Sequence, residues 1–118
     1  MWLITCTIGV HLMLKSKIKP TIQVIIGGIY LQSVGEESTN SYVGLALQYL
    51  RKSKDLSQVQ VCVDTDMSKS NFYKLERGSA NITMDHLDLF SKALDTTPCD
   101  ILNLSETIKN QSKGEQHG

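Results

Sequence analysis

Cysteine is scarce in this chain of 118 residues. The three cysteines are Cys6, Cys62 and Cys99. An odd number without any C-x-x-C pair suits neither a disulfide framework nor a zinc site, and it is typical of a reducing compartment. We therefore expect Cys62 and Cys99 to pack as small apolar side chains rather than to react as thiols.

Catalytic and metal-binding motifs are also lacking. None of the three histidines has Cys, Asp or Glu at metal-ligand spacing. The pair Gly27-Gly28 is too short to indicate a nucleotide site, and no nucleophile elbow or isolated carboxylate pair is found. We expect no enzyme, no cofactor and no metal. The length leaves no room for a second domain that senses a small-molecule ligand.

Net charge is lacking too, because 12 Lys and Arg balance 12 Asp and Glu. Bulk charge therefore predicts no particular partner. The apolar runs at 1–14 and 21–34 fall short of the roughly 18 residues that a membrane span needs. Lysines follow the first run, whereas a signal peptide begins with its cations. We expect no membrane partner and a cytoplasmic location.

Residues 1–40 read as an N-terminal extension with two open interpretations. The β-branched residues at 21–26 favour a strand, and the two apolar runs could form a weak β-hairpin that needs a partner surface. Alternatively, residues 1–34 come from a start codon assigned too early. Leu31 or Val34 would then mark the true start, and Gly27-Gly28 would be encoded by a ribosome-binding sequence. Glycine codons other than GGA-GGN would remove the reason for this second interpretation.

The stretch from 41 to 104 contains the periodicity of five short helices. Val43, Ala46, Leu47 and Leu50 have the i, i+3, i+4, i+7 spacing of one helix face, which Asn40 or Ser41 would cap. Later helices are expected to begin at Ser57, Ser68, Thr83 and Thr97, the last with Pro98 at its first position. The inward side chains would be Leu56, Val61, Cys62, Met67, Phe72, Leu75, Leu87, Phe90, Leu94, Ile101 and Leu102. We predict an all-α domain at 41–104 and a disordered polar tail at 105–118.

The second and third predicted helices are separated by a sharp turn at Asp66. Aspartate tolerates a left-handed backbone better than most residues do. Ser68 would cap the third helix, and Gly78 would end it. Two helices joined by such a tight turn are typical of a helix-turn-helix.

Four segments resemble the lambda-repressor-like (XRE/Cro) family of bacterial and phage transcriptional regulators. They are VGLALQYLR at 43–51, LSQ at 56–58, SKSNFYKLERG at 68–78 and LDLFSKALDTTPCDIL at 87–102. The resemblance covers roughly residues 43–102 without a gap. It implies a five-helix domain that binds the major groove of double-stranded DNA. We expect a small dimeric repressor of prophage or mobile-element type.

The resemblance also implies a DNA-binding face on the third helix. Lys69, Ser70 and Lys74 match the base-contacting positions of the family. Lysine can donate to guanine O6 and N7, and serine can pair with several base edges. Ser68 and Asn71 are expected on the same outer face.

Three further residues have implied roles. Gln58 matches the phosphate-binding glutamine of the family, at a helix N-terminus whose N–H groups favour an anion. Arg51 and Glu76 match an ion pair that links the first helix to the third. We assign this pair to architecture rather than to DNA recognition.

Some residues depart from the family pattern. Thr65 and Asp66 stand where the family has an apolar residue and glycine, and Asp64 adds a second negative charge. Over 43–81 the basic residues are 51, 52, 54, 69, 74 and 77, against acidic 55, 64, 66 and 76. This mild excess predicts weak binding by a monomer, so a dimer through the fourth and fifth helices would be needed.

Other functions remain possible within this fold. A restriction–modification controller and an antitoxin are both small dimeric proteins that only the neighbouring genes would distinguish. A protein-interaction module that has lost DNA binding is the alternative from another class. Exposed Val59 and Val63 would provide its surface, unless they pack beneath the N-terminal extension.

Overall fold

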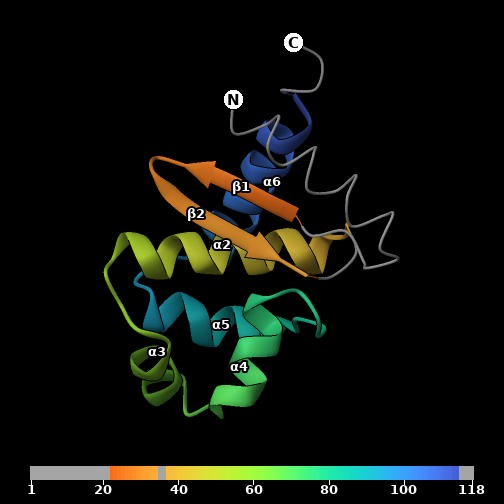
Figure 1. The fold of residues 1–118 in the computed structure, drawn as a ribbon. Helices are drawn as coiled ribbons and strands as arrows, with labels where there is room; N and C mark the ends of the chain where they lie inside the picture. Colours follow the sequence, from red (N-terminus) through yellow and green to blue (C-terminus); the bar gives the residue numbers. More distant parts are fainter. Residues whose placement is uncertain (1–21, 35–36, 115–118) are drawn as a thin grey trace.

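The computed structural model describes residues 22–34 and 37–114. Its elements are β1 (Ile22–Ile26), β2 (Ile29–Ser33), α2 (Thr39–Ser53), α3 (Gln58–Thr65), α4 (Lys69–Glu76), α5 (Met84–Ala93) and α6 (Pro98–Gly114). Helix α2 crosses the middle of the molecule, with the hairpin and α6 on one side and α3, α4 and α5 on the other (Figure 1). The described part is mostly helical, with one small hairpin in the N-terminal extension. The hairpin interpretation is therefore confirmed in part: both strands lie within the second apolar run, and they do not pair the first run with the second.

The hairpin is held together by a two-residue turn. Its strands are antiparallel, and Ile26 pairs with Ile29 across Gly27 and Gly28. Both glycines have positive φ, at 57° and 82°, as a primed turn requires. This turn chemistry sets the register that turns Val24 and Leu31 toward the protein interior.

The hairpin belongs to the core of the protein. Val24 and Leu31 are buried in one apolar cluster with residues of α2, which supplies the packing surface that an isolated hairpin lacks. The boundary expected at residue 40 therefore divides a single core. Residues 1–21 lie outside the described residues, and the early start codon stays a prediction.

Side-chain caps begin the helices. Ser57, Ser68 and Thr83 accept from the backbone N–H three residues later, as predicted. The first helix begins earlier than expected, because Ser38 rather than Asn40 or Ser41 is its N-cap. Asn40 instead bonds the side chain of Asn81 and the N–H of Ile82, each at 2.9 Å. It ties the loop before α5 to α2.

Aspartates occupy the left-handed position at three helix ends. Asp55, Asp66 and Asp95 have φ of 59°, 54° and 54°. At each end the next residue donates its N–H to a carbonyl five residues back, as in Leu56 to Arg51, Met67 to Cys62 and Thr96 to Ser91. The left-handed conformation predicted for Asp66 is confirmed.

Helix α6 contradicts the predicted disorder from residue 105 onward. It continues to Gly114, and Ser105 and Ile108 are buried. Ile101, Leu104, Ser105 and Ile108 have the spacing of one helix face, which packs against α2. Leu102 is 40% exposed rather than buried. Residues 115–118 lie outside the described part.

The remaining predicted core is largely present. Most of the named apolar side chains are buried, while Leu50, Leu56 and Met67 are partly buried around them. The rings of Phe72 and Phe90 join α4 to α5 at a centroid distance of 5.7 Å. Among the described helices, none is long and apolar enough to cross a bilayer.

Candidate nucleic-acid interface

The turn between α3 and α4 is compact despite its polar sequence. Asp66 takes φ 54° and ψ 41°, and Met67 N–H bonds the carbonyl of Cys62 at 3.0 Å. Thr65 is buried, at a position where the sequence resemblance implied an apolar residue. Its hydroxyl donates to the Val61 carbonyl at 2.7 Å, which satisfies the polar group. The two departures in this turn are therefore compatible with a helix-turn-helix.

One side of α4 is anchored and the other is open to solvent. Phe72, Leu75 and Glu76 are buried. The five side chains expected to face DNA are all exposed. Ser68 is the N-cap, three lie in the first turn of α4 and one lies in its last turn: Lys69, Ser70, Asn71 and Lys74. The Ser68 oxygen accepts from Asn71 N–H at 3.1 Å, so its own proton is available to a phosphate or a base.

Gln58 lies at the start of α3 and reaches toward α4. Its Nε2 donates to Glu76 Oε1 at 2.9 Å. A side-chain amide nitrogen carries two N–H groups, so this bond fixes the orientation of the amide and leaves the second N–H for a further acceptor. The structure places Gln58 between the ion pair and the first turn of α3.

Arg51 and Glu76 lie in direct contact. Nε of Arg51 is 2.5 Å from Oε2 of Glu76, and Nη2 is 3.2 Å from Oε1. Arg51 also donates to the carbonyl of Leu56 at 3.1 Å. Together with Gln58, this contact joins α2, α3 and α4 at one carboxylate that is only 2% exposed. A fork-to-fork geometry of this kind fixes direction as well as distance.

The sequence reasoning missed an aromatic–cation pair beside the exposed face. The Arg77 guanidinium lies 4.9 Å from the centre of the Tyr73 ring, and its Nη1 donates to the Tyr73 hydroxyl at 2.5 Å. Tyr73 and Arg77 are four residues apart, and this i, i+4 spacing on a predicted helix could have indicated the pair. Tyr73 is 43% exposed, so this pair lies at the protein surface.

The contacts of α2 with the end of α4 were missed as well. Gly44, Gln48 and Arg51 follow one another at helical spacing, and each meets the last residues of α4. A Cβ on Gly44 would lie 2.7 Å from the carbonyl oxygen of Glu76. Gln48 donates to that same oxygen at 2.8 Å. One face of α2 therefore holds the C-terminal end of α4.

An apolar groove flanks α3. Val59 and Val63 are 54% and 68% exposed, so they do not pack beneath the described hairpin. Cys62 and Met67 line the same groove, together with Asp66, Ser68 and Lys69. Burial raises the pKa of the Cys62 thiol, which disfavours the reactive thiolate. Cys99, predicted to be buried, is exposed.

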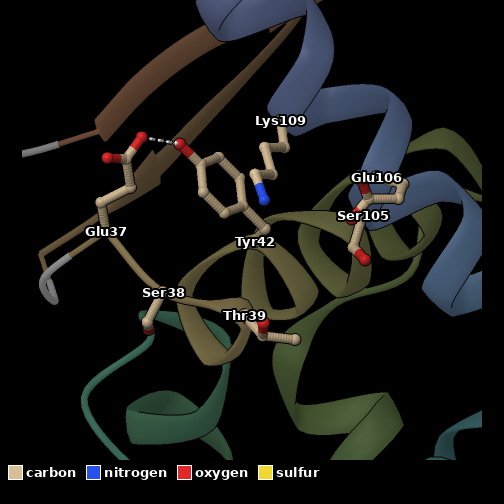
Figure 2. A pocket seen from close by; sticks show the side chains of 7 residues that line it. All are labelled: Glu37, Ser38, Thr39, Tyr42, Ser105, Glu106 and Lys109. Carbon is tan, nitrogen blue, oxygen red and sulfur yellow. Dashed lines mark hydrogen bonds between the residues drawn. The ribbon is translucent and has the colours of Figure 1, made fainter.

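A second, polar pocket lies between α2 and α6. It measures about 200 Å³ and is lined by Glu37, Ser38, Thr39, Tyr42, Ser105, Glu106 and Lys109 (Figure 2). The Tyr42 hydroxyl donates to Glu37 Oε2 at 2.7 Å. Burial, followed by this bond, raises the pKa of Tyr42 to about 12. No group of three metal-ligating side chains is found among the described residues.

A family comparison agrees with this geometry. The model of the Cro/C1-type helix-turn-helix DNA-binding domain matches residues 46–106. The chain belongs to this family. It is also 32% identical over 68 residues to Control protein C.BamHI of Bacillus amyloliquefaciens, which covers 57% of this chain and 83% of that protein.

Solved structures share the fold. The clp gene regulator ClgR of Corynebacterium glutamicum has a TM-score of 0.62 at 22% identity, over 70% of this chain and 88% of ClgR. The restriction–modification controller C.Esp1396I, a tetramer in complex with its 35-base-pair operator, has a TM-score of 0.56 at 21% identity, over 61% and 95%. This protein is therefore a helix-turn-helix DNA-binding transcriptional regulator, as the sequence resemblance implied. Membership in the family disfavours an interaction module that has lost DNA binding.

Proposed function

We propose that this protein is a dimeric, cytoplasmic regulator of the restriction–modification controller type, with α4 in the major groove of its operator. The observation that carries the controller assignment is the 32% identity to C.BamHI over 83% of that protein. The five helices would form a lambda-repressor-like domain and would act as a regulator rather than as an enzyme. A prophage repressor or an antitoxin differs from a controller in its gene neighbours. A nuclease or methyltransferase gene beside this one supports the proposal, and a toxin gene overturns it.

The DNA-binding face is proposed from exposure and charge. Lys69, Ser70 and Lys74 would contact bases, Ser68 and Asn71 would lie at the groove edge, and Gln58 would donate its free N–H to a phosphate. Each phosphate contact contributes about 0.9 to the slope of log affinity against log salt. With so few cations on this face, a single domain would bind DNA weakly. Two domains of a dimer on successive half-sites would together reach the affinity that a regulator needs.

A second copy is the proposed occupant of the α5–α6 surface. Leu89 on α5 and Leu102 on α6 are 38% and 40% exposed, and the two helices pack against each other. A two-fold contact there would bury both leucines from each copy. Leu89→Asp combined with Leu102→Asp should give a monomer in light scattering and should weaken operator binding. A dimer that survives both substitutions would refute this contact.

The DNA face is tested with a sequence selected from a random pool by the wild-type protein. Lys69→Ala and Lys74→Ala should each weaken binding to the selected DNA by about tenfold or more. Their free energies of unfolding should stay unchanged because both side chains are exposed. Lys54→Ala, an exposed lysine at the C-cap of α2 and outside both α4 and the α5–α6 surface, is the matched control. Equal affinities for all four proteins would refute the proposed face.

A further inference from the structure

The C-terminal end of α4 is held by residues from outside the helix-turn-helix. The last carbonyls of a helix have no partner within it. Here the Arg77 carbonyl accepts from Ser33 Oγ at 2.9 Å and from Val34 N–H at 3.0 Å. Strand β2 and the residue that follows it therefore complete the hydrogen bonding at the end of α4.

Gln48 links β2 to α4 directly. Its Nε2 donates to the carbonyls of Gln32 at 2.6 Å and of Glu76 at 2.8 Å, while its Oε1 accepts from Gln32 N–H at 3.1 Å. Both amide N–H groups are used, and the side chain is only 5% exposed. One buried amide thus fixes the spacing between the hairpin and α4, because leaving any of these groups unpaired would be costly.

The fit around this bridge leaves little room for movement. A Cβ on Gly44 would collide with the carbonyls of Leu75 and Glu76 at 2.8 and 2.7 Å. A Cβ on Gly78 would lie 2.6 Å from Ser33 Oγ. Helix α4 therefore rests against α2 on one side and β2 on the other, at the end opposite Lys69 and Ser70.

The geometry points to a role for the hairpin in DNA recognition: Gln48 is a positioning residue through which β2 sets the direction of α4. This inference rests on the proposed base-contacting face of α4. The eight residues of α4 span about 12 Å, so a tilt of about 5° at the fixed end displaces the exposed end by about 1 Å. A displacement of that size is enough to misalign hydrogen bonds to base edges. Binding to random DNA depends on charge and on phosphate contacts, which carry no sequence information and would tolerate the displacement better.

The test compares binding to selected DNA with binding to random DNA. Gln48→Met keeps the length of the side chain and removes all three hydrogen bonds. It should lower affinity for the selected DNA by about tenfold, with affinity for random DNA unchanged. Ser33→Ala removes one bond to the Arg77 carbonyl and should produce a smaller loss of the same kind. All measurements are made at a temperature at which circular dichroism shows each protein to be folded.

Ile108→Ala is the control for a purely structural effect. Ile108 is buried on α6, which packs against α2, so its truncation lowers stability without removing any hydrogen bond of the Gln48 bridge. The ratio of specific to non-specific affinity should stay at the wild-type value. If Gln48→Met and Ser33→Ala also keep the wild-type ratio, the positioning role is refuted. If instead Lys69→Ala and Lys74→Ala leave operator binding intact, the proposed base-contacting face is the part that fails.

Discussion

Arg51 holds Glu76 through two contacts, at 2.5 Å from Nε to Oε2 and at 3.2 Å from Nη2 to Oε1. Glu76 is 2% exposed, and Gln58 donates a third hydrogen bond to it. A buried carboxylate is costly unless it is paired and hydrogen-bonded. The ion pair therefore fixes how α2, α3 and α4 meet, even where its net stabilisation is small.

Arg51→Met should lower the free energy of unfolding by about 3–5 kcal/mol, because it leaves a buried carboxylate without its cation. The free energy of unfolding of Arg51→Lys should lie between those of Arg51→Met and the wild type, since an ammonium keeps the charge but lacks the planar fork of a guanidinium. Urea unfolding followed by circular dichroism measures both effects.

Two controls accompany this series. Lys54→Met changes an exposed cation on the C-cap of the same helix and should shift stability by less than about 0.5 kcal/mol. The double variant Arg51→Met, Glu76→Met should regain part of the lost stability, because no charge is then buried. An Arg51→Met protein as stable as the wild type would contradict a buried, obligatory pair.

The helix-turn-helix could be predicted from sequence because its determinants are local. Caps at Ser57 and Ser68 and the turn at Asp66 each act within a few residues. The bridge through Gln48 could not be found in this way, since its partners lie 16 and 28 residues away in the chain. A glutamine in an amphipathic helix gives no sign that it is buried until those partners are placed.

The two ends of the domain were harder to predict for a related reason. The hairpin was foreseen only as one of two interpretations, because its stability depends on the surface of α2. After residue 104, Ile108 is the only large apolar side chain in a polar stretch, and composition alone favoured disorder. Ile101, Leu104, Ser105 and Ile108 do have the spacing of one helix face. That face can be recognised as buried only when α2, against which it packs, has been placed.

One pair of variants at Asp66 separates the effect of backbone strain on stability from the effect of charge on DNA binding. Its φ of 54° is left-handed, which is unfavourable for residues with a Cβ and free for glycine. Asp66→Gly should raise the free energy of unfolding by about 0.5–1 kcal/mol, and Asp66→Ala should lower it by a similar amount. Thermal unfolding of the two proteins measures the difference.

Both Asp66 variants remove the same negative charge beside α4. They should therefore tighten binding to random DNA to the same extent, by electrostatics alone. If Asp66→Ala proves as stable as Asp66→Gly, the left-handed conformation is not maintained in solution. If DNA affinity follows stability rather than charge, the electrostatic explanation is wrong.

The raised pKa of Tyr42 predicts a loss of stability at alkaline pH. Its pKa is raised from the ordinary 10.0 to about 12, first by burial and then by the hydrogen bond to Glu37. The folded state favours the neutral phenol, so the stabilisation is fully present below pH 10 and is lost as the pH rises toward 12. The stability advantage of wild type over Tyr42→Phe should shrink across this range. Urea unfolding at a series of pH values measures it, and a constant difference from pH 9 to about 12 would contradict the shifted pKa.

Ile108 tests whether α6 is an integral part of the domain. Its side chain is fully buried on the face of α6 that packs against α2, whereas a disordered tail would leave it in water. Ile108→Ala should lower the free energy of unfolding by about 2–5 kcal/mol, through lost burial and the cavity left behind. Asn110→Ala, at an exposed position on the same helix, should change it by less than about 0.5 kcal/mol. Equal stability of the two variants in urea would mean that α6 ends before residue 108 in solution, because only an ordered, packed helix distinguishes these two side chains.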